Sequence, residues 1–242
     1  MLSVVIPFYN EQESILDVCL EVEQVLSRAY GADWEIVMVD DGSTDSTGEK
    51  MDKLAAGRRG FRAIQLRPNS GQSAALEAGI RAARGRLVAT LDGDGQNDPS
   101  DLPRLVELMR QRGVDMMCGI RARRADSLAR RVMSRVANRI RAAVLHDEIT
   151  DVGCSLRVFR RDRALRVRFF RNAHRFFPAL FIMQGFKVAE MPVGHRPRKR
   201  GTSKYGGGFR SRAVVGLVDL AGVWWLRRRA LRYHATEGGH AP

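Results

Sequence analysis

The stretch RLVATLDGDGQ at residues 86–96 decides the fold of this chain. Its first half is apolar and predicts a short buried strand, at whose end Asp92 and Asp94 stand one residue apart. Two carboxylates at this spacing are close enough to hold one hard divalent cation, as a metal-bound diphosphate requires. Asp and Gly are also common in surface turns, so the neighbouring segments must decide between the two interpretations.

The composition indicates one sizeable folded domain with a strong excess of positive charge. Of the 242 residues, 44% are hydrophobic and 28% are charged, as in ordinary globular proteins. The chain has 41 Lys and Arg against 27 Asp and Glu, which gives a formal net charge of +14. Such a surface favours anionic partners, namely nucleic acid, acidic lipid headgroups or phosphorylated substrates.

The cysteines and the N-terminus both point to an intracellular protein. Cys19, Cys118 and Cys154 are odd in number and widely spaced, which argues against a disulfide framework and against a zinc site. A reducing cytosol is therefore the expected compartment. The chain enters a strand-like run at Leu2 without the basic and apolar regions of a signal peptide, so none is expected.

Strand-like and helix-like segments alternate through the first part of the chain. Short β-branched runs predict strands, and apolar residues at helical spacing predict the helices between them. The predicted strands are 2–6, 35–39, 61–66 and 86–91, and the predicted helices are 15–26 and 73–83. Alternation of this kind predicts an α/β fold with a largely parallel sheet, covered by helices on both faces.

Polar segments follow three of these strands. They are PFYNE at residues 7–11, DDGS at 40–43 and DGD at 92–94. Because ligands in parallel sheets bind at the carboxyl ends of the strands, we expect all three segments to converge on one site. The presence of the other two polar segments favours the interpretation of Asp92 and Asp94 as ligands of a metal-bound diphosphate over a surface turn.

Seven segments together resemble the family-two inverting glycosyltransferases, in the polyprenyl-phosphate branch of the dolichyl-phosphate mannose synthase type. The resemblance covers about residues 3–205 in the family's order, and is therefore more specific than any single motif. It implies a Rossmann-like GT-A fold and a nucleotide-diphosphate sugar as donor. The segments are VIPFYNE at 5–11, VDDGSTDST at 39–47, NSGQ at 69–72, DGDGQ at 92–96, GIR at 119–121, DVGC at 151–154 and RKRGTSK at 198–204.

The resemblance implies a nucleoside pocket at the ends of the first two strands. Pro7, Tyr9 and Glu11 would frame the nucleoside, with Tyr9 packing against it and Glu11 accepting hydrogen bonds from base or ribose. Val39 and Asp41 would line the other side. Without the resemblance, Tyr9 would be an ordinary strand-end aromatic, and Glu11 a carboxylate stabilised by the positive end of a helix dipole.

The resemblance also implies that Asp92, Asp94 and Gln96 hold Mg²⁺ or Mn²⁺ against the donor diphosphate. All three side chains carry oxygen donors, which suit hard cations. Gly93 and Gly95 would let the diphosphate approach the backbone closely. The metal would offset the negative charge that builds on the leaving nucleotide.

The implied acceptor is a polyprenyl phosphate. A phosphate monoester is mostly dianionic at neutral pH and needs no general base. The expected cations are Arg121 at the acceptor phosphate, and Arg198 and Lys204 at the donor diphosphate. Asp151 is expected to orient a basic side chain or a sugar hydroxyl; if the acceptor were instead a sugar hydroxyl, Asp151 would be the catalytic base.

Two segments predict contact with a membrane surface. Residues 127–145 have the spacing of a basic amphipathic helix, with a helix packed on the domain as the alternative. Residues 213–226 are apolar apart from Asp219, but fall short of the roughly 20 residues of a spanning helix. Trp224 and Trp225 beside an arginine cluster predict an interfacial helix, with a helix that forms a homodimer as the alternative.

The expected organisation is a catalytic domain at 1–210 followed by an amphipathic helix and tail at 211–242. The expected location is cytoplasmic, bound peripherally to the inner face of the membrane, where the lipid is reached directly or through a separate membrane protein.

The predicted function is metal-dependent inverting transfer of a sugar to a polyprenyl phosphate, with transfer to a sugar hydroxyl in glycolipid or polysaccharide synthesis as the alternative. The sequence does not distinguish between four donors, namely GDP-mannose, UDP-glucose, UDP-N-acetylhexosamine and UDP-aminoarabinose derivatives. The net charge alone would suit a nucleic-acid-binding protein, but no helix-turn-helix, zinc motif or aromatic-basic strand supports that class, and no nucleic acid is expected as partner.

Overall fold

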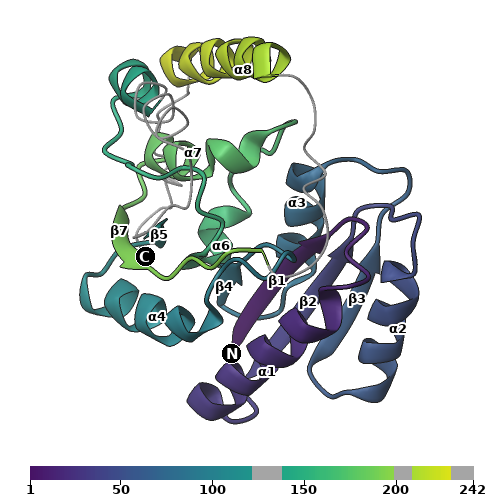
Figure 1. Ribbon diagram of the computed structural model, residues 1–242. Coiled ribbons are helices and arrows are strands. Elements are labelled where there is room, and N and C mark those ends of the chain that lie inside the picture. The colour runs from purple at the N-terminus through teal and green to yellow at the C-terminus, as the bar shows by residue number, and fades with distance from the viewer. Residues whose placement is uncertain (122–137, 199–208, 230–242) are drawn as a thin grey trace, which may run out of the picture. The chain divides into compact units, whose positions relative to one another are not determined.

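The computed structural model describes residues 1–121, 138–198 and 209–229, which fall into two units, Met1–Gly206 and Gly207–Pro242. The first unit is an α/β domain (Figure 1). Its elements are β1 (Leu2–Phe8), α1 (Ile15–Tyr30), β2 (Trp34–Asp40), α2 (Thr47–Gly57), β3 (Phe61–Gln65), α3 (Gln72–Ala82), β4 (Leu87–Thr90), α4 (Leu102–Gln111), β5 (Met116–Arg121), β6 (Arg157–Arg160), α6 (Arg161–Ala164), α7 (Phe177–Met183) and β7 (Val188–Val193).

A seven-stranded sheet in the order β3-β2-β1-β4-β6-β5-β7 forms the centre of this unit. Every neighbouring pair is parallel except those of β6, which runs antiparallel to both β4 and β5. The mainly parallel sheet is confirmed, and the four predicted strands match β1 to β4 within two residues at each end. In β1 and β2 nearly every residue is buried, as expected where helices cover both faces of a sheet.

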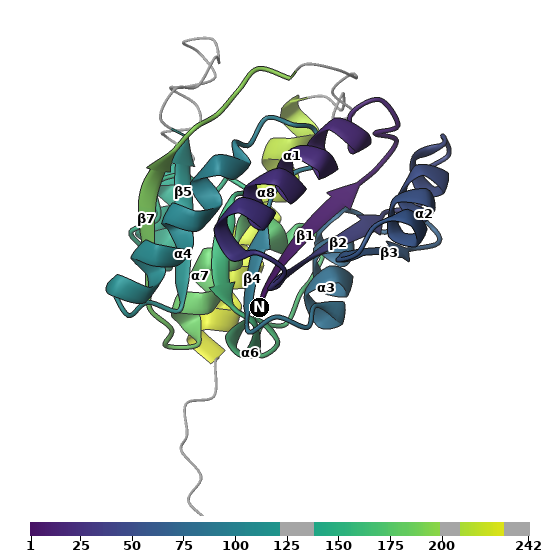
Figure 2. The same cartoon turned by 90° about the horizontal axis from the view of Figure 1, so that it is seen from below.

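The two faces of β1 are covered by different helices (Figure 2). Val4, Ile6 and Phe8 belong to the core that α1, α2 and α4 close on one face. On the opposite face α3 lies so close to the sheet that a Cβ at Gly79 would be 2.3 Å from Val5 Cγ1. The register pairs Phe8 with the last residue of β2, so that the two strands end together.

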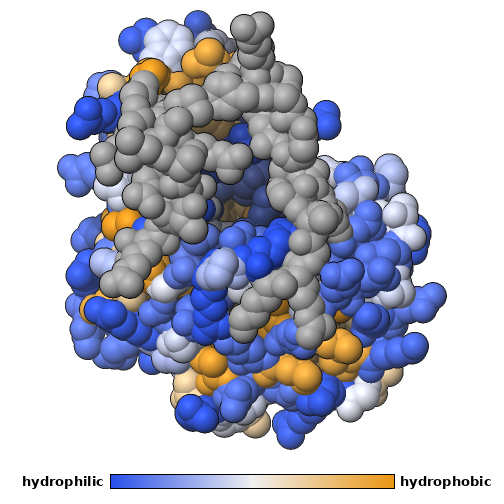
Figure 3. Space-filling view, viewed as in Figure 1, coloured by the Kyte–Doolittle hydropathy of each residue, from blue (hydrophilic) through white to orange (hydrophobic). Residues whose placement is uncertain are grey.

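The surface of this unit that Figure 3 shows is mostly hydrophilic, with apolar residues gathered over α1. Leu16 and Leu20 of α1 are among the exposed large hydrophobic residues. Much of the accessible surface of any soluble protein is apolar, and two exposed leucines one turn apart on α1 support no functional assignment.

The predicted basic amphipathic helix at 127–145 is described only in part. Residues 138–145 are helical, and the rest of that segment lies outside the described residues. Arg141 is buried there, and its Nη1 donates to both carboxylate oxygens of Asp147 at 2.8 Å. That arginine is therefore committed to an internal ion pair rather than to a solvated basic face.

The C-terminal unit contains α8 (Phe209–Arg229), which confirms the helix predicted there. Its apolar residues are distributed around the axis rather than gathered on one face, so the expectation of a one-sided amphipathic helix was wrong. The guanidinium of Arg228 lies 4.3 Å from the ring centroid of Trp224, one helical turn away. Among the described residues, none of the helices combines the length and apolar content needed to cross a bilayer.

The contact between α3 and the sheet predicts the effect of enlarging Gly79. Gly79→Ala should lower the free energy of unfolding by about 1–3 kcal/mol, because the added methyl group has no space against Val5 and the helix must move. Urea unfolding of wild type and variant measures this. Gly57→Ala in α2 is the matched control, since a Cβ there meets nothing within 4 Å, and it should not destabilise the protein. Equal stability of both variants would contradict the close packing of α3.

Candidate functional site

The carboxyl ends of β1, β2 and β4 open into one cavity of about 790 Å³. Eight of the predicted site residues line it, namely Pro7, Tyr9, Glu11, Asp41, Asp92, Gly93, Asp94 and Arg198. Val39 does not, because its side chain is fully buried in the sheet. Gln96, Arg121 and Asp151 also lie outside the lining, and Lys204 lies outside the described residues.

The loops after β1 and β2 hold each other in place. The backbone N–H of Asn10 donates to Ser43 Oγ at 2.8 Å, and the N–H of Thr44 donates back to Asn10 Oδ1 at 2.7 Å. The hydroxyl of Ser14 lies 2.8 Å from Glu11 Oε2 and 2.9 Å from the carbonyl oxygen of Gly93. These contacts fix the Glu11 carboxylate beside the loop after β4.

Asp41 follows β2, and its buried side chain contacts the residues just before α3. Its Oδ1 accepts hydrogen bonds from the backbone N–H groups of Ser70 and Gly71 at 2.9 and 3.1 Å, where the positive end of the helix dipole favours a carboxylate. The pKa of Asp41 is nevertheless raised, because the effect of burial exceeds the lowering effect of these hydrogen bonds. Gly42 has φ +74°, and a Cβ there would be 2.7 Å from the backbone nitrogen of Asn69, so only glycine permits this turn.

Asp92 stands at the end of β4 with a raised pKa. Gln72 Nε2 donates to its Oδ1 at 2.7 Å, and its own backbone N–H donates to Asn97 Oδ1 at 3.0 Å. Burial, and then the neighbouring charge of Asp94, raise the pKa of Asp92 to about 6. A Cβ at Gly93 would be 2.4 Å from Phe8 Cδ1, so the glycine between the two carboxylates is required by packing against β1.

Arg198 bridges two of the carboxylates in the cavity. Its Nη1 donates to Glu11 Oε1 and its Nη2 to Asp94 Oδ2, both at 3.0 Å. A guanidinium in this position shows that the Asp94 end of the cavity attracts a cation. Gln96 Nε2 donates to the Arg196 carbonyl oxygen at 3.3 Å, and its backbone N–H donates to Asp94 Oδ1 at 3.1 Å.

The donor set fits Mg²⁺ or Mn²⁺ only if the ligand supplies further oxygens. Within the described ranges, no group of three or more His, Cys, Asp or Glu residues could hold a metal ion by itself. Mg²⁺ is often bound by one or two carboxylates together with substrate phosphates and water. Asp92 and Asp94 suit that arrangement, in which a diphosphate completes the coordination.

Arg121 and Asp151 form a buried pair outside the cavity lining. Nε and Nη2 of Arg121 donate to the two carboxylate oxygens of Asp151 at 2.9 and 2.7 Å, and the backbone N–H of Arg121 donates at 3.1 Å. Asp151 is 6% exposed, and its own N–H donates to Glu190 Oε1 at 3.3 Å. Both carboxylate oxygens of Asp151 thus accept hydrogen bonds from Arg121, and the pair fixes the orientation of that guanidinium group.

A further side of the cavity, formed by residues 169–175, was not predicted from the sequence; we call it the wall at residues 169–175. His174 is anchored there by Ser73, whose Oγ lies 2.8 Å from its Nδ1 and accepts from its backbone N–H at 3.1 Å. Burial lowers the pKa of His174 from 6.5 to about 3, so the ring is neutral. The cluster of aromatic and basic residues in RFFRNAHR was the available signal; the lining residues are Phe169, Phe170, Arg171, Asn172, His174 and Arg175.

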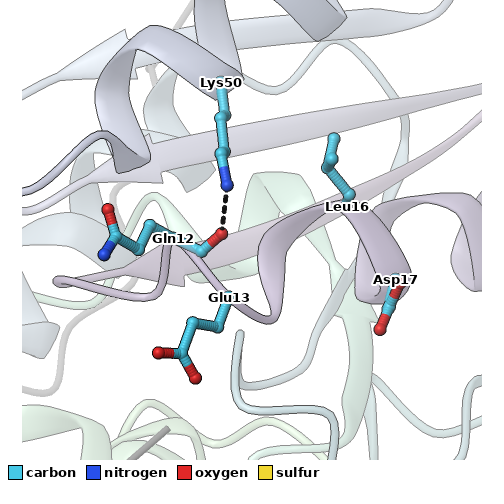
Figure 4. Close-up of a pocket in the computed structure, with 5 residues that line it drawn as sticks. All are labelled: Gln12, Glu13, Leu16, Asp17 and Lys50. Carbon is cyan, nitrogen blue, oxygen red and sulfur yellow. Dashed lines mark hydrogen bonds between the residues drawn. The ribbon is translucent and has the colours of Figure 1, made fainter. Parts of the chain in front are cut away.

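A second cavity of about 520 Å³ lies at the start of α1 (Figure 4). Lys50 Nζ donates to the carbonyl oxygen of Gln12 at 2.6 Å, which commits the only lysine among its lining residues. The carboxylates Glu13 and Asp17 line it as well, without facing the strand ends that form the main cavity. We assign it no function.

Comparison with known proteins gives a consistent result. The family model "Glycosyl transferase family 2" matches residues 3–167. Dodecaprenyl-phosphate galacturonate synthase of Rhizobium johnstonii is 38% identical, over 98% of this chain and 69% of that protein. Undecaprenyl-phosphate 4-deoxy-4-formamido-L-arabinose transferase of Pectobacterium carotovorum is 40% identical, over 84% of this chain and 62% of that protein.

Solved structures with the same fold include glucosyl-3-phosphoglycerate synthase from Mycobacterium tuberculosis. Its complex with Mn²⁺ and UDP-glucose superposes with a TM-score of 0.67 at 18% identity, covering 92% of this chain and 79% of that one. Another crystal structure of the same protein contains Mg²⁺ and UDP. At this identity the likeness shows the fold alone, which is the predicted GT-A fold.

The depressed pKa of His174 predicts a pH dependence of stability. Its folded pKa is depressed, so its contribution is complete above pH 6.5 and is lost as the pH falls towards 3, since the unfolded state binds the proton more readily. His174→Asn can keep a bond to Ser73 but has no titrating ring. Between pH 7 and pH 5 the wild type should therefore lose about 2 kcal/mol more stability than the variant. Urea unfolding at the two pH values measures this, and equal losses would contradict a depressed pKa.

Proposed function

Because the chain belongs to glycosyl transferase family 2, we propose that it transfers a sugar from a nucleotide-diphosphate donor to a polyprenyl phosphate. The observation that carries this proposal is the convergence of Glu11, Asp41, Asp92 and Asp94 on one cavity at the strand ends. The names of both relatives include a polyprenyl phosphate and a sugar. Since the chain spans 69% and 62% of their lengths, the substrates are assigned here as a proposal.

The donor nucleoside is proposed to bind between the loops after β1 and β2. Tyr9 is 38% exposed in the cavity and offers a ring face for stacking. Glu11 and Asp41 are both buried carboxylates that can accept hydrogen bonds from a base or ribose. Val39 would act only through its place in β2, because its side chain does not reach the cavity.

The donor diphosphate is proposed to lie over Asp92, Gly93 and Asp94. A bound Mg²⁺ or Mn²⁺ supplies Lewis-acid stabilisation of the charge on the leaving diphosphate. Asp92 and Asp94 would hold that ion, and Arg198 would turn from Glu11 and Asp94 towards the phosphates. Lys204 remains a second proposed cation for the diphosphate, from outside the described residues.

The acceptor phosphate is proposed to bind near Arg121, which Asp151 orients through two parallel hydrogen bonds. A phosphate that is already ionised attacks without a general base. This suits a site in which Asp151 is tied to Arg121. Transfer to a sugar hydroxyl would require a carboxylate able to accept a proton, and the bonded state of Asp151 favours the phosphate acceptor.

The C-terminal unit is proposed to bind the membrane surface at its cytoplasmic face. Trp224 and Trp225 each lie near an arginine one turn later in α8, an arrangement that suits the interface between headgroups and water. Because the apolar residues surround the axis, the contact would involve mainly this aromatic and basic end. A second copy of the chain or a separate membrane protein could be the partner of the same helix.

Removal of Asp94 tests the metal site. Asp94→Ala should lower turnover by roughly 10³-fold, because the Lewis acid contributes several kcal/mol and each 1.36 kcal/mol is a factor of ten. Radiolabelled sugar transfer to undecaprenyl phosphate, measured with Mg²⁺ or Mn²⁺, gives the rate. Asp162→Ala removes an exposed carboxylate outside the cavity and should keep full activity. Unchanged transfer in excess chelator would overturn the metal assignment.

Replacing the tryptophans of α8 tests the membrane contact. The double variant Trp224→Ala, Trp225→Ala should sediment less with anionic liposomes, since the two rings provide the apolar part of the proposed contact. Binding should also weaken as salt rises, because each basic residue contributes about 1 kcal/mol at an anionic surface. Nucleotide-sugar binding should stay unchanged as the control. Sedimentation equal to that of the wild type would assign α8 to a protein partner.

A further inference from the structure

The wall at residues 169–175 is held rigidly at the side of the cavity. Arg157 on β6 donates through Nη1 to the carbonyl oxygen of His174 at 2.8 Å, in addition to the two contacts of His174 with Ser73. The ring centroids of Phe169 and Phe177 are 5.0 Å apart, and those of Phe170 and Phe176 are 6.2 Å apart. A segment fixed in this way can present its remaining side chains in one geometry.

Two arginines of this wall have no ion-pair partner among the described residues. Arg171 and Arg175 both line the cavity and are exposed, and neither side chain has a hydrogen bond or ion pair within the part of the chain that the structure describes. Arg198, which lines the same cavity, is by contrast paired with both Glu11 and Asp94. Arg171 and Arg175 are therefore available to bind an anionic group of a ligand.

Consecutive residues at the start of α3 show which end of the cavity this wall occupies. Gly71 bonds to Asp41, Gln72 to Asp92, and Ser73 to His174. His174 therefore lies beyond the Asp92 carboxylate, away from Asp41. If the nucleoside binds at Asp41 and the diphosphate at Asp92, the group that reaches His174 is the sugar.

The ring of His174 is neutral and is fixed at one of its two nitrogens. Ser73 Oγ accepts from the backbone N–H of His174 and lies 2.8 Å from Nδ1, so the Ser73 hydroxyl holds both the backbone and the ring. A neutral imidazole can hydrogen-bond to a sugar hydroxyl through its other nitrogen in either tautomer. The wall thus combines a neutral imidazole with two guanidinium groups.

We propose, on the basis of the proposed function, that Arg171, His174 and Arg175 form the subsite for the transferred sugar and that this sugar is a hexuronic acid. The carboxylate is bound by the two arginines, and Nε2 of His174 forms a hydrogen bond with a hydroxyl group of the sugar. Planar guanidinium groups match the planar carboxylate in charge and in geometry. A neutral sugar would leave both arginines without an anionic partner.

Paired donors test this assignment directly. The affinities of UDP-glucuronate and UDP-galacturonate are compared by calorimetry with those of UDP-glucose and UDP-galactose, with Mn²⁺ and without acceptor; UDP is the common reference. The wild type should bind each acid at least about tenfold more tightly than its neutral counterpart, as expected for a charge-assisted hydrogen bond. Arg171→Gln and Arg175→Gln should each reduce that preference several-fold, and leave the affinity for UDP unchanged.

Arg168→Gln is the matched control, because Arg168 is exposed in the same segment but does not line the cavity, and it should keep the preference. Equal affinity of the wild type for acidic and neutral sugars would overturn the assignment. So would variants that keep the preference but raise the KM for undecaprenyl phosphate, since the arginines would then bind the acceptor. The binding measurement needs no acceptor, so transfer of a neutral sugar would refute the hexuronate alone, whereas tight hexuronate binding without lipid transfer would refute the proposed acceptor alone.

Discussion

The close approach of three carboxylates, Glu11, Asp92 and Asp94, is the constraint on which the site depends. Burial, and then the charge of Asp94, raise the pKa of Asp92, so the arrangement costs free energy unless positive charge is supplied. Arg198 supplies it by bonding to Glu11 and Asp94, and Gln72 donates a further hydrogen bond to Asp92. A metal-bound diphosphate would satisfy the same groups. Ligand binding would then exchange one set of counter-charges for another, without burying new unpaired charge.

The parallel sheet brings these carboxylates together, and glycine makes their spacing feasible. The β1–β2 register ends both strands at the same level, so the residues that follow them meet in one place. Gly93 lies against the ring of Phe8 and Gly42 against the backbone of Asn69, where any side chain would collide. These two glycines therefore set how closely the loops after β4 and β2 approach their neighbours, and thereby the width of the cavity.

The strand-helix alternation and the acidic strand ends could be predicted from local sequence, because buried parallel strands read as apolar runs and their ends as polar ones. The antiparallel insertion of β6 could not, since nothing local in RVFR specifies its neighbours. The same holds for the pairing of Arg121 with Asp151, which joins residues 30 positions apart. His174 was missed for a related reason: its partner Ser73 lies 101 residues away, and no spacing rule links the two.

The placement of the cations, more than the net charge, decides what the cavity can bind. Among its described lining residues, five carboxylates (Glu11, Asp41, Glu77, Asp92 and Asp94) outnumber three arginines (Arg171, Arg175 and Arg198), although the whole chain carries +14. A uniformly anionic ligand would therefore be repelled by much of the wall. A ligand with negative charge only at its middle and at its far end would meet Arg198 at one point and Arg171 and Arg175 at the other. Such a distribution of charge favours one orientation of the donor, and that orientation would present the sugar to the acceptor.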